Sequence, residues 1–254
     1  MRWCRCVYGF LLMHPRLFLT FLCCIFASCA APGGGGSAAG TSAGRDPLGH
    51  RPGPRGFRTV ILDAGHGGKD SGAISAVTGS WEKDLALDTA RRVRSELGGD
   101  FRVIMMRDSD EFIDLDERVA RASRNGGAVM VSIHFNSGPS GQRGAETFFW
   151  RVDSSSLARR VQARVASVAG SARGTVRRRI RLTRNPEIPC ILTECGYLSH
   201  PVEARRCADP GYRQQLAHAI ASGIREQAAR GDDGMGPLPP PLNEPLSRAS
   251  DPRE

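Results

Sequence analysis

The sequence of 254 residues has few aromatic side chains and almost no lysine. It contains three Trp and three Tyr, and Lys69 and Lys83 are the lysines among its 35 basic residues. No basic motif interleaved with aromatics occurs, which excludes the usual nucleic-acid recognition modules, and we expect no nucleic-acid partner. The net charge of +9 comes almost entirely from arginine. Because an arginine excess also follows genomic composition, this charge argues only weakly for an anionic partner.

Long hydrophobic runs are also missing. A membrane-spanning helix needs about 20 apolar residues, and no run in the sequence is that long. The shorter uncharged run Leu17–Ala31 has the layout of a secretory signal. Its end, Phe26–Cys29, reads Phe-Ala-Ser-Cys and resembles a bacterial lipoprotein processing site, although phenylalanine stands where leucine is usual. We expect residues 1–29 to be a signal peptide of the lipoprotein type, with the lipid on Cys29. Ordinary signal cleavage nearby is the alternative.

Two flanking segments are dominated by Gly, Pro, Ser and Ala. Such composition cannot bury enough apolar area to offset chain entropy. We therefore expect residues 30–56 to be a flexible linker and residues 231–254 to be a disordered tail. The folded, catalytic domain is then predicted at residues 57–230, and the linker would let it reach away from a membrane anchor.

Cysteines suitable for a disulfide framework or a structural zinc site are scarce. Five of the eight lie before residue 30, which leaves Cys190, Cys195 and Cys207 in the predicted domain. Three is an odd number, so at least one stays unpaired within the chain. None has the C-x-x-C spacing of a structural zinc site.

Within the domain, strand-like and helix-like runs alternate. Period-2 and continuous apolar patterns predict strands at 60–62, 101–106, 128–134, 144–150, 179–183 and 188–194. Apolar residues at helical spacing predict helices at 82–97, 115–123, 155–168 and 212–229. This alternation predicts an α/β sheet with helices packed on both faces.

Candidate metal ligands lie at the ends of three of these elements. His66 lies in a glycine-rich loop after the first strand, His134 ends the strand 128–134, and Glu82 begins a helix. Carboxyl ends of strands gather ligand sites in such sheets. Two imidazoles and one carboxylate leave one position open in a tetrahedral zinc shell, as in catalytic sites. Taken alone, Glu82 is explained more simply as a carboxylate at a helix N-terminus, and His134 as a hydrogen-bonded core histidine.

Glu194 is the candidate for moving a proton beside that metal. It ends an otherwise apolar strand, where an unpaired buried carboxylate is costly. A carboxylate in that place can take a proton from water and hand it to a departing amine nitrogen.

Several segments resemble the zinc-dependent N-acetylmuramoyl-L-alanine amidases of the amidase 3 type, in order from about Val60 to Ile224. They are residues 60–73, 81–83, 106–110, 115–118, 132–136 and 188–199. The resemblance implies a single α/β domain with a mixed, mostly parallel sheet of about six strands. It implies zinc bound by His66, Glu82 and His134, and catalysis by Glu194. It also implies hydrolysis of the amide between the lactyl group of N-acetylmuramic acid and the L-alanine of the peptidoglycan stem peptide.

Three features within the resemblance concern partners and substrate. Some family members carry an inserted helix that blocks the zinc until an activator protein displaces it. Residues 150–177 have room for one ordinary helix, so we expect that no activator is required. His200 stands where the family commonly has asparagine, which leaves the substrate-side role of its loop open. An arginine run could meet carboxylates of the stem peptide or form a solvated strand edge: Arg177, Arg178, Arg179, Arg181 and Arg184.

The predicted function is that of an exported zinc amidase, acting on peptidoglycan in the periplasm or cell envelope during cell-wall remodelling, cell separation or recycling. A non-catalytic peptidoglycan-binding protein of the same fold is one alternative. A zinc peptidase that cuts within the stem peptide is the other.

Overall fold

The computed structural model describes residues 53–233, which form a six-stranded sheet in the order β2-β1-β3-β6-β4-β5. The neighbours β2, β1, β3 and β6 run parallel, β4 is antiparallel to β6, and β5 is parallel to β4. This confirms the predicted single α/β domain with a mixed, mostly parallel sheet. The strands are β1 (Thr59–Ala64), β2 (Arg102–Met105), β3 (Val129–Asn136), β4 (Ala145–Phe149), β5 (Ala172–Arg177) and β6 (Cys190–Tyr197).

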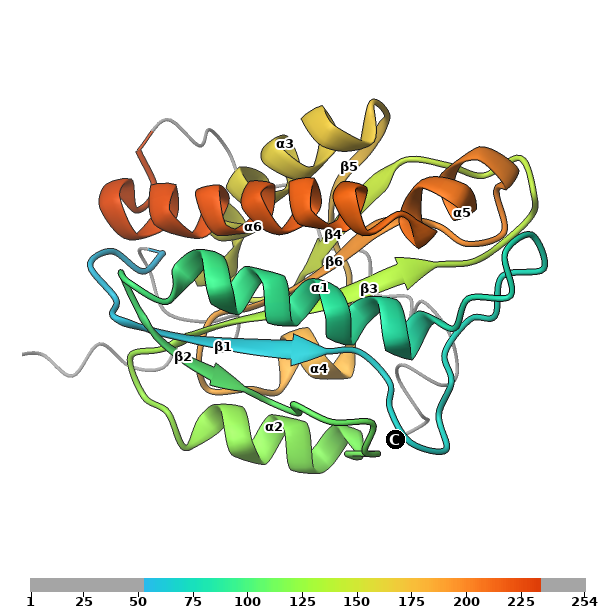
Figure 1. Cartoon of the computed structure of the whole chain (residues 1–254). Coiled ribbons are helices and arrows are strands. Elements are labelled where there is room, and N and C mark those ends of the chain that lie inside the picture. Colours follow the sequence, from blue (N-terminus) through green and yellow to red (C-terminus); the bar gives the residue numbers. More distant parts are fainter. Residues whose placement is uncertain (1–52, 234–254) are drawn as a thin grey trace, which may run out of the picture. The chain divides into compact units, whose positions relative to one another are not determined.

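Helices cover both faces of the sheet, as predicted. Figure 1 shows α1 (Glu82–Leu97) and α6 (Pro210–Arg230) on one side, and α2 (Leu115–Ser123) and α4 (Arg181–Arg184) on the other. The helix α3 (Ser155–Ala169) shares the core of α1 and α6. The remaining helical segments are α5 (Pro201–Ala208) and the 3-10 turn η1 (Val152–Ser154).

Side-chain alternation along β3 divides the core between the two faces. Val129, Val131 and Ile133 pack in the larger cluster with α1, α3 and α6, whereas Met130 packs in the smaller cluster with α2 and α4. Because successive side chains of a strand point to opposite faces, His134 lies on the same face as Met130. That face is covered by helices of only nine and four residues. Its carboxyl end is therefore left open for a site.

One predicted strand is wrong. Residues 179–183 do not form a strand, because the chain turns there into the short helix α4, and Ile180 and Leu182 are buried against the sheet from that turn. The strand at this edge of the sheet is β5, which pairs with β4. Its sequence Ala-Arg-Gly-Thr-Val-Arg has no apolar run, so the hydrophobic pattern gave no signal for it.

The helix α5 was not predicted, although its start carries recognisable signals. Pro201 occupies the first turn, and His200 at the N-cap accepts a hydrogen bond from the Glu203 backbone N–H through Nδ1 at 3.3 Å. A proline in the first turn after a capping side chain is a common helix start. His200 is thus a capping residue, and it does not line the cavity described below.

Several predictions fall wholly or partly outside residues 53–233. The predicted signal peptide, the lipid on Cys29, most of the linker and residues 234–254 of the predicted tail lie outside the described residues. The described residues of the predicted linker and tail contact each other and the domain: the Gly53 N–H donates to Asp232 Oδ2 at 2.7 Å, and Arg160 Nη2 donates to the carbonyls of Gly231 and Asp233 at 2.9 Å. Between residues 53 and 233, no helix has both the length and the hydrophobicity to cross a membrane.

Candidate metal centre and active site

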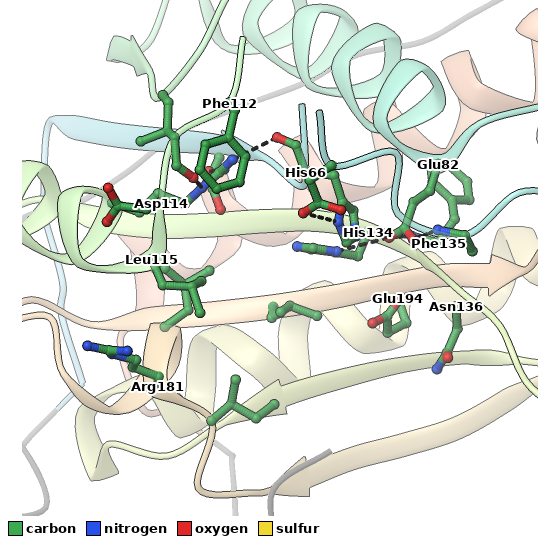
Figure 2. Close-up of a pocket in the computed structure, with 18 of the residues that line it drawn as sticks. His66, Glu82, Phe112, Asp114, Leu115, His134, Phe135, Asn136, Arg181 and Glu194 are labelled. Carbon is green, nitrogen blue, oxygen red and sulfur yellow. Dashed lines mark hydrogen bonds and ion pairs between the residues drawn. The ribbon is translucent and has the colours of Figure 1, made fainter. Parts of the chain in front are cut away.

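The structure brings His66, Glu82 and His134 together at the carboxyl edge of the sheet. One ligand atom from each lies within 4.8 Å of the others. His66 Nε2 and His134 Nδ1 are each 3.0 Å from Glu82 Oε1. Figure 2 shows the two imidazoles and the carboxylate directed at one another. The three predicted ligands therefore form one cluster, although 68 positions separate the first from the last.

The loop after β1 holds His66 in an unusual conformation. Its φ of +59° is the left-handed region, which costs a non-glycine residue roughly 1–2 kcal/mol. His66 Nδ1 donates to Asp70 Oδ2 at 2.9 Å, and the His66 carbonyl accepts from Arg118 Nη2 at 2.7 Å. Asp70 is itself fixed by the Gly72 N–H, which donates to its Oδ1 at 3.0 Å. These bonds leave Nε2 of His66 directed at Glu82, and carboxylate-bound histidines of this kind are typical of metal ligands.

Two buried arginines tie this loop to its neighbours. Arg107 donates to the carbonyls of Ala64 at 2.9 Å, Gly65 at 2.8 Å and Lys83 at 2.8 Å, which joins the end of β1 to the first turn of α1. Arg118 forms a buried ion pair with Asp63. The sequence showed these three charged side chains only as parts of the family resemblance. Their role in supporting the loop depends on long-range contacts, which no local pattern reveals.

Two glycines leave room for the cluster. A Cβ on Gly65 would lie 2.3 Å from Cε1 of His134. A Cβ on Gly72, whose φ is +62°, would lie 2.6 Å from both Glu82 Oε2 and His66 Cδ2. Any side chain at either position would therefore displace a candidate ligand.

Glu82 is buried and ionised between the two imidazoles. Burial alone would raise its pKa, but the hydrogen bonds from His134 and His66, together with their charges, lower the pKa of Glu82 well below its usual range. Burial would likewise lower the pKa of His66, but hydrogen bonds to Glu82 and Asp70 and their charges raise that pKa to about 9. Glu82 Oε1 also accepts from the Phe135 N–H at 3.1 Å, and Oε2 accepts from the Ala73 N–H at 2.9 Å.

Glu194 lies beside this cluster on β6. It is opposite His134 of β3 and Glu146 of β4 in the strand register, so the three side chains share one face. Its Oε2 is buried and finds no hydrogen-bond partner among residues 53–233. Burial, and after it the charges of Glu82 and Glu146, raise the pKa of Glu194 well above its usual range. A buried carboxyl oxygen without a partner is costly unless a ligand or a proton completes it.

The cluster and Glu194 line one cavity of about 920 Å³ on the face of the sheet that carries α2 and α4. Figure 2 shows Glu194 and Asn136 at one side of it, and Leu115 and Arg181 at the other. Two nitrogen donors and one oxygen donor suit zinc, and the cavity leaves space for further ligands and a substrate. The residues present therefore fit a zinc ion.

This combination of an α/β sheet, a His-Glu-His cluster and a neighbouring buried glutamate defines a candidate metallohydrolase. The sequence model of the family described as N-acetylmuramoyl-L-alanine amidase matches residues 60–226. The chain belongs to this family.

Curated relatives agree with this assignment. The chain is 35% identical over 173 residues to the uncharacterised protein YqiI of Bacillus subtilis, an alignment that covers 66% of this chain and 83% of YqiI. It is 31% identical to the probable cell wall amidase LytH of Staphylococcus epidermidis, covering 66% of this chain and 58% of LytH. It is 30% identical to the N-acetylmuramoyl-L-alanine amidase LytC of Bacillus subtilis, covering 65% of this chain and 34% of LytC. The match thus spans little more than half of LytH and about a third of LytC.

Solved structures show the same fold. The catalytic domain of CwlV, an N-acetylmuramoyl-L-alanine amidase from Paenibacillus polymyxa, superposes with a TM-score of 0.65 at 34% identity, covering 67% of this chain and 97% of that domain. The CwlD amidase of Clostridioides difficile, solved in complex with the GerS lipoprotein, superposes with a TM-score of 0.63 at 30% identity, covering 66% and 97%.

Proposed function

We propose that this protein is a zinc-dependent amidase that hydrolyses the bond between the lactyl group of N-acetylmuramic acid and the L-alanine of peptidoglycan stem peptides. Membership of the N-acetylmuramoyl-L-alanine amidase family supports the reaction and the substrate. The observation that carries the mechanism is the approach of His66, Glu82 and His134 to within 4.8 Å, in the cavity that Glu194 also lines.

His66, Glu82 and His134 would hold the zinc ion. Zinc bound there would activate a water molecule and polarise the scissile carbonyl. Asp70 would keep the proton on Nδ1 of His66, which leaves Nε2 free as the ligand atom. The hydrogen bonds from Ala73 and Phe135 to Glu82 would hold the carboxylate in place while its charge is shared with the metal.

Glu194 would be the catalytic residue that moves the proton. It would accept a proton from the attacking water and donate it to the departing nitrogen of L-alanine, so that the products leave as a carboxylic acid and a free amine. Its place in the cavity that the three candidate ligands also line supports this role.

Action in the cell envelope follows from this substrate, and cell wall amidases are among the relatives. Export by a signal peptide, and anchoring through a lipid on Cys29, remain proposals for residues outside the described part of the chain. The alternative of ordinary signal cleavage stays open with them.

The protein would work without an activator protein. The segment between β4 and β5 contains α3, which packs into the core with α1 and α6, and the cavity lies on the other face of the sheet. CwlD, by comparison, was solved with the GerS lipoprotein. Purified protein that stays inactive on peptidoglycan until an envelope extract is added would contradict this proposal.

Digestion of purified peptidoglycan, followed by mass spectrometry, tests the proposed function. We expect free stem peptides with L-alanine at the amino terminus, loss of these products after treatment with a chelator, and recovery with added zinc. Cuts inside the stem peptide would support the peptidase alternative. Binding of the protein to peptidoglycan without any product would support the non-catalytic alternative.

A further inference from the structure

The part of the cavity between Glu194 and Arg181 is not used by the proposed reaction, and we call this part the arm. Leu192 precedes Glu194 by two residues on the same face of β6, so about 7 Å of strand separates their Cα atoms. Arg181 lies at the side of the cavity away from Glu194 (Figure 2). The arm between them has an apolar wall from β6, α4 and the chain around the start of α2: Leu192, Ile180, Leu182, Ile113 and Leu115.

Arg181 is the member of the arginine run at 177–184 that lines this cavity. It begins α4, and its Nη2 pairs with Asp116 in the first turn of α2. The Arg181 side chain is 27% exposed and that of Asp116 is 70% exposed. A pair this open to water is weak, so an incoming anion can displace Asp116 and use the fork of donors on the guanidinium.

The other arginine in the cavity wall, Arg118, is already committed to the protein. Its side chain is 4% exposed. Its Nε donates to the Ile113 carbonyl at 2.9 Å, and its other two nitrogens bind Asp63, Ala64 and His66. The remaining ionisable lining residues are two histidines and six acids, and the acids would repel an anion. The six acids are Asp63, Asp70, Glu82, Asp114, Asp116 and Glu194. Both histidines belong to the metal cluster and bind Glu82. Away from that cluster, Arg181 is therefore the place in this wall where a negatively charged group of a substrate is attracted.

We propose that Arg181 binds the free carboxylate on the stem-peptide residue that follows L-alanine, and so determines specificity for stem peptides that keep this carboxylate ionised. The inference rests on the proposed function. With the scissile amide beside Glu194, the leaving peptide runs along the apolar arm. An extended residue spans about 3.3–3.6 Å, so two residues cover the roughly 7 Å of strand between Glu194 and Leu192. The second residue then lies in the part of the cavity that Arg181 also lines. Arg181 makes no contact with the scissile bond and acts as a specificity residue.

The experiment compares two soluble glycan substrates that differ in one group. Both carry L-alanine followed by a second residue, which is D-glutamate with a free α-carboxylate in one and D-isoglutamine, its carboxamide, in the other. For the zinc-loaded wild-type protein we expect kcat/KM to be about tenfold higher on the acid, the size typical of a charge-assisted hydrogen bond. Arg181→Gln should abolish this preference by raising KM for the acid, with cleavage of the carboxamide nearly unchanged. Arg181→Lys should restore part of the preference.

Two further variants keep the inference falsifiable. Arg121→Gln removes an ion-paired arginine of α2 outside the cavity and should keep the preference. Asp116→Asn removes the anion that competes for Arg181, and should lower KM for the acid a few-fold. An Arg181→Gln variant that keeps the preference, or loses both activities equally, would overturn the inference while leaving the amidase function standing. Wild-type protein that releases no peptide from either substrate would refute the proposed function and this inference with it.

Discussion

Replacing Gly65 by alanine tests the candidate metal centre without removing a ligand. The added Cβ would lie 2.3, 2.5 and 2.6 Å from Cε1, Nε2 and Nδ1 of His134. Ordinary contacts of this kind begin at about 3.4 Å, so the imidazole has to move by roughly 1 Å. Overpacking of this size typically costs about 1–3 kcal/mol of stability. A ring displaced by that distance cannot keep a zinc–nitrogen bond of about 2.0–2.1 Å without distorting the shell.

We expect Gly65→Ala to weaken zinc binding by about tenfold to a hundredfold, comparable to the loss of a supporting partner. Amidase activity at saturating zinc should fall by about a hundredfold, as for other misplacements of about 1 Å. Zinc affinity is measured by competition with a chromogenic chelator, and activity by release of stem peptides. Gly126→Ala is the matched control, because a Cβ there meets nothing within 4 Å. Gly65→Ala protein with wild-type zinc affinity would show that His134 is not a ligand, or that the loop yields without cost.

The remaining predictions concern the other parts of the site. Glu194→Gln should bind zinc like the wild type and lose activity by about 10²–10⁴-fold, whereas His134→Ala should lose both zinc binding and activity. Zinc titration beside an activity assay distinguishes the two variants. Wild-type turnover by Glu194→Gln would remove Glu194 from the mechanism. Arg118→Gln leaves the buried Asp63 without its cation and should lower the free energy of unfolding by about 3–5 kcal/mol. Urea unfolding of the zinc-free protein measures this, and a loss below about 1 kcal/mol would mean that Ser132, which donates to Asp63 at 2.6 Å, suffices as its partner.

Most of the sheet was predictable because its central strands carry strong local patterns. Each of β1, β3 and β6 contains a run of three consecutive apolar residues, which is typical of parallel strands covered on both faces. The edge strand β5 has no such pattern and gains its conformation from pairing with β4. The alternation of Ile180 and Leu182 looked like a strand but belongs to the turn into α4, since burial of alternate residues is not unique to strands.

The candidate site was predictable at the level of residue types and strand ends. His66 follows β1, and His134 and Glu194 lie in the carboxyl-terminal halves of β3 and β6. The structure places all three, with Glu82, around one cavity. Their roles stay predictions. The five arginines of the run at 177–184 were indistinguishable in the sequence. The turn into α4 selects Arg181, because that residue pairs with Asp116 of α2 and lines the cavity.

By itself, the sequence determined the alternation of strands and helices, the glycine loop around His66 and the chemical types of the four site residues, because these are local properties of the chain. Only the tertiary structure decided which distant groups support them. The contacts of Asp63 with Arg118 and Ser132 join positions 55 and 69 residues apart, and the tie from Arg107 to Gly65 spans 42 residues. The sheet order brings such positions together, and no periodicity in the sequence specifies that order.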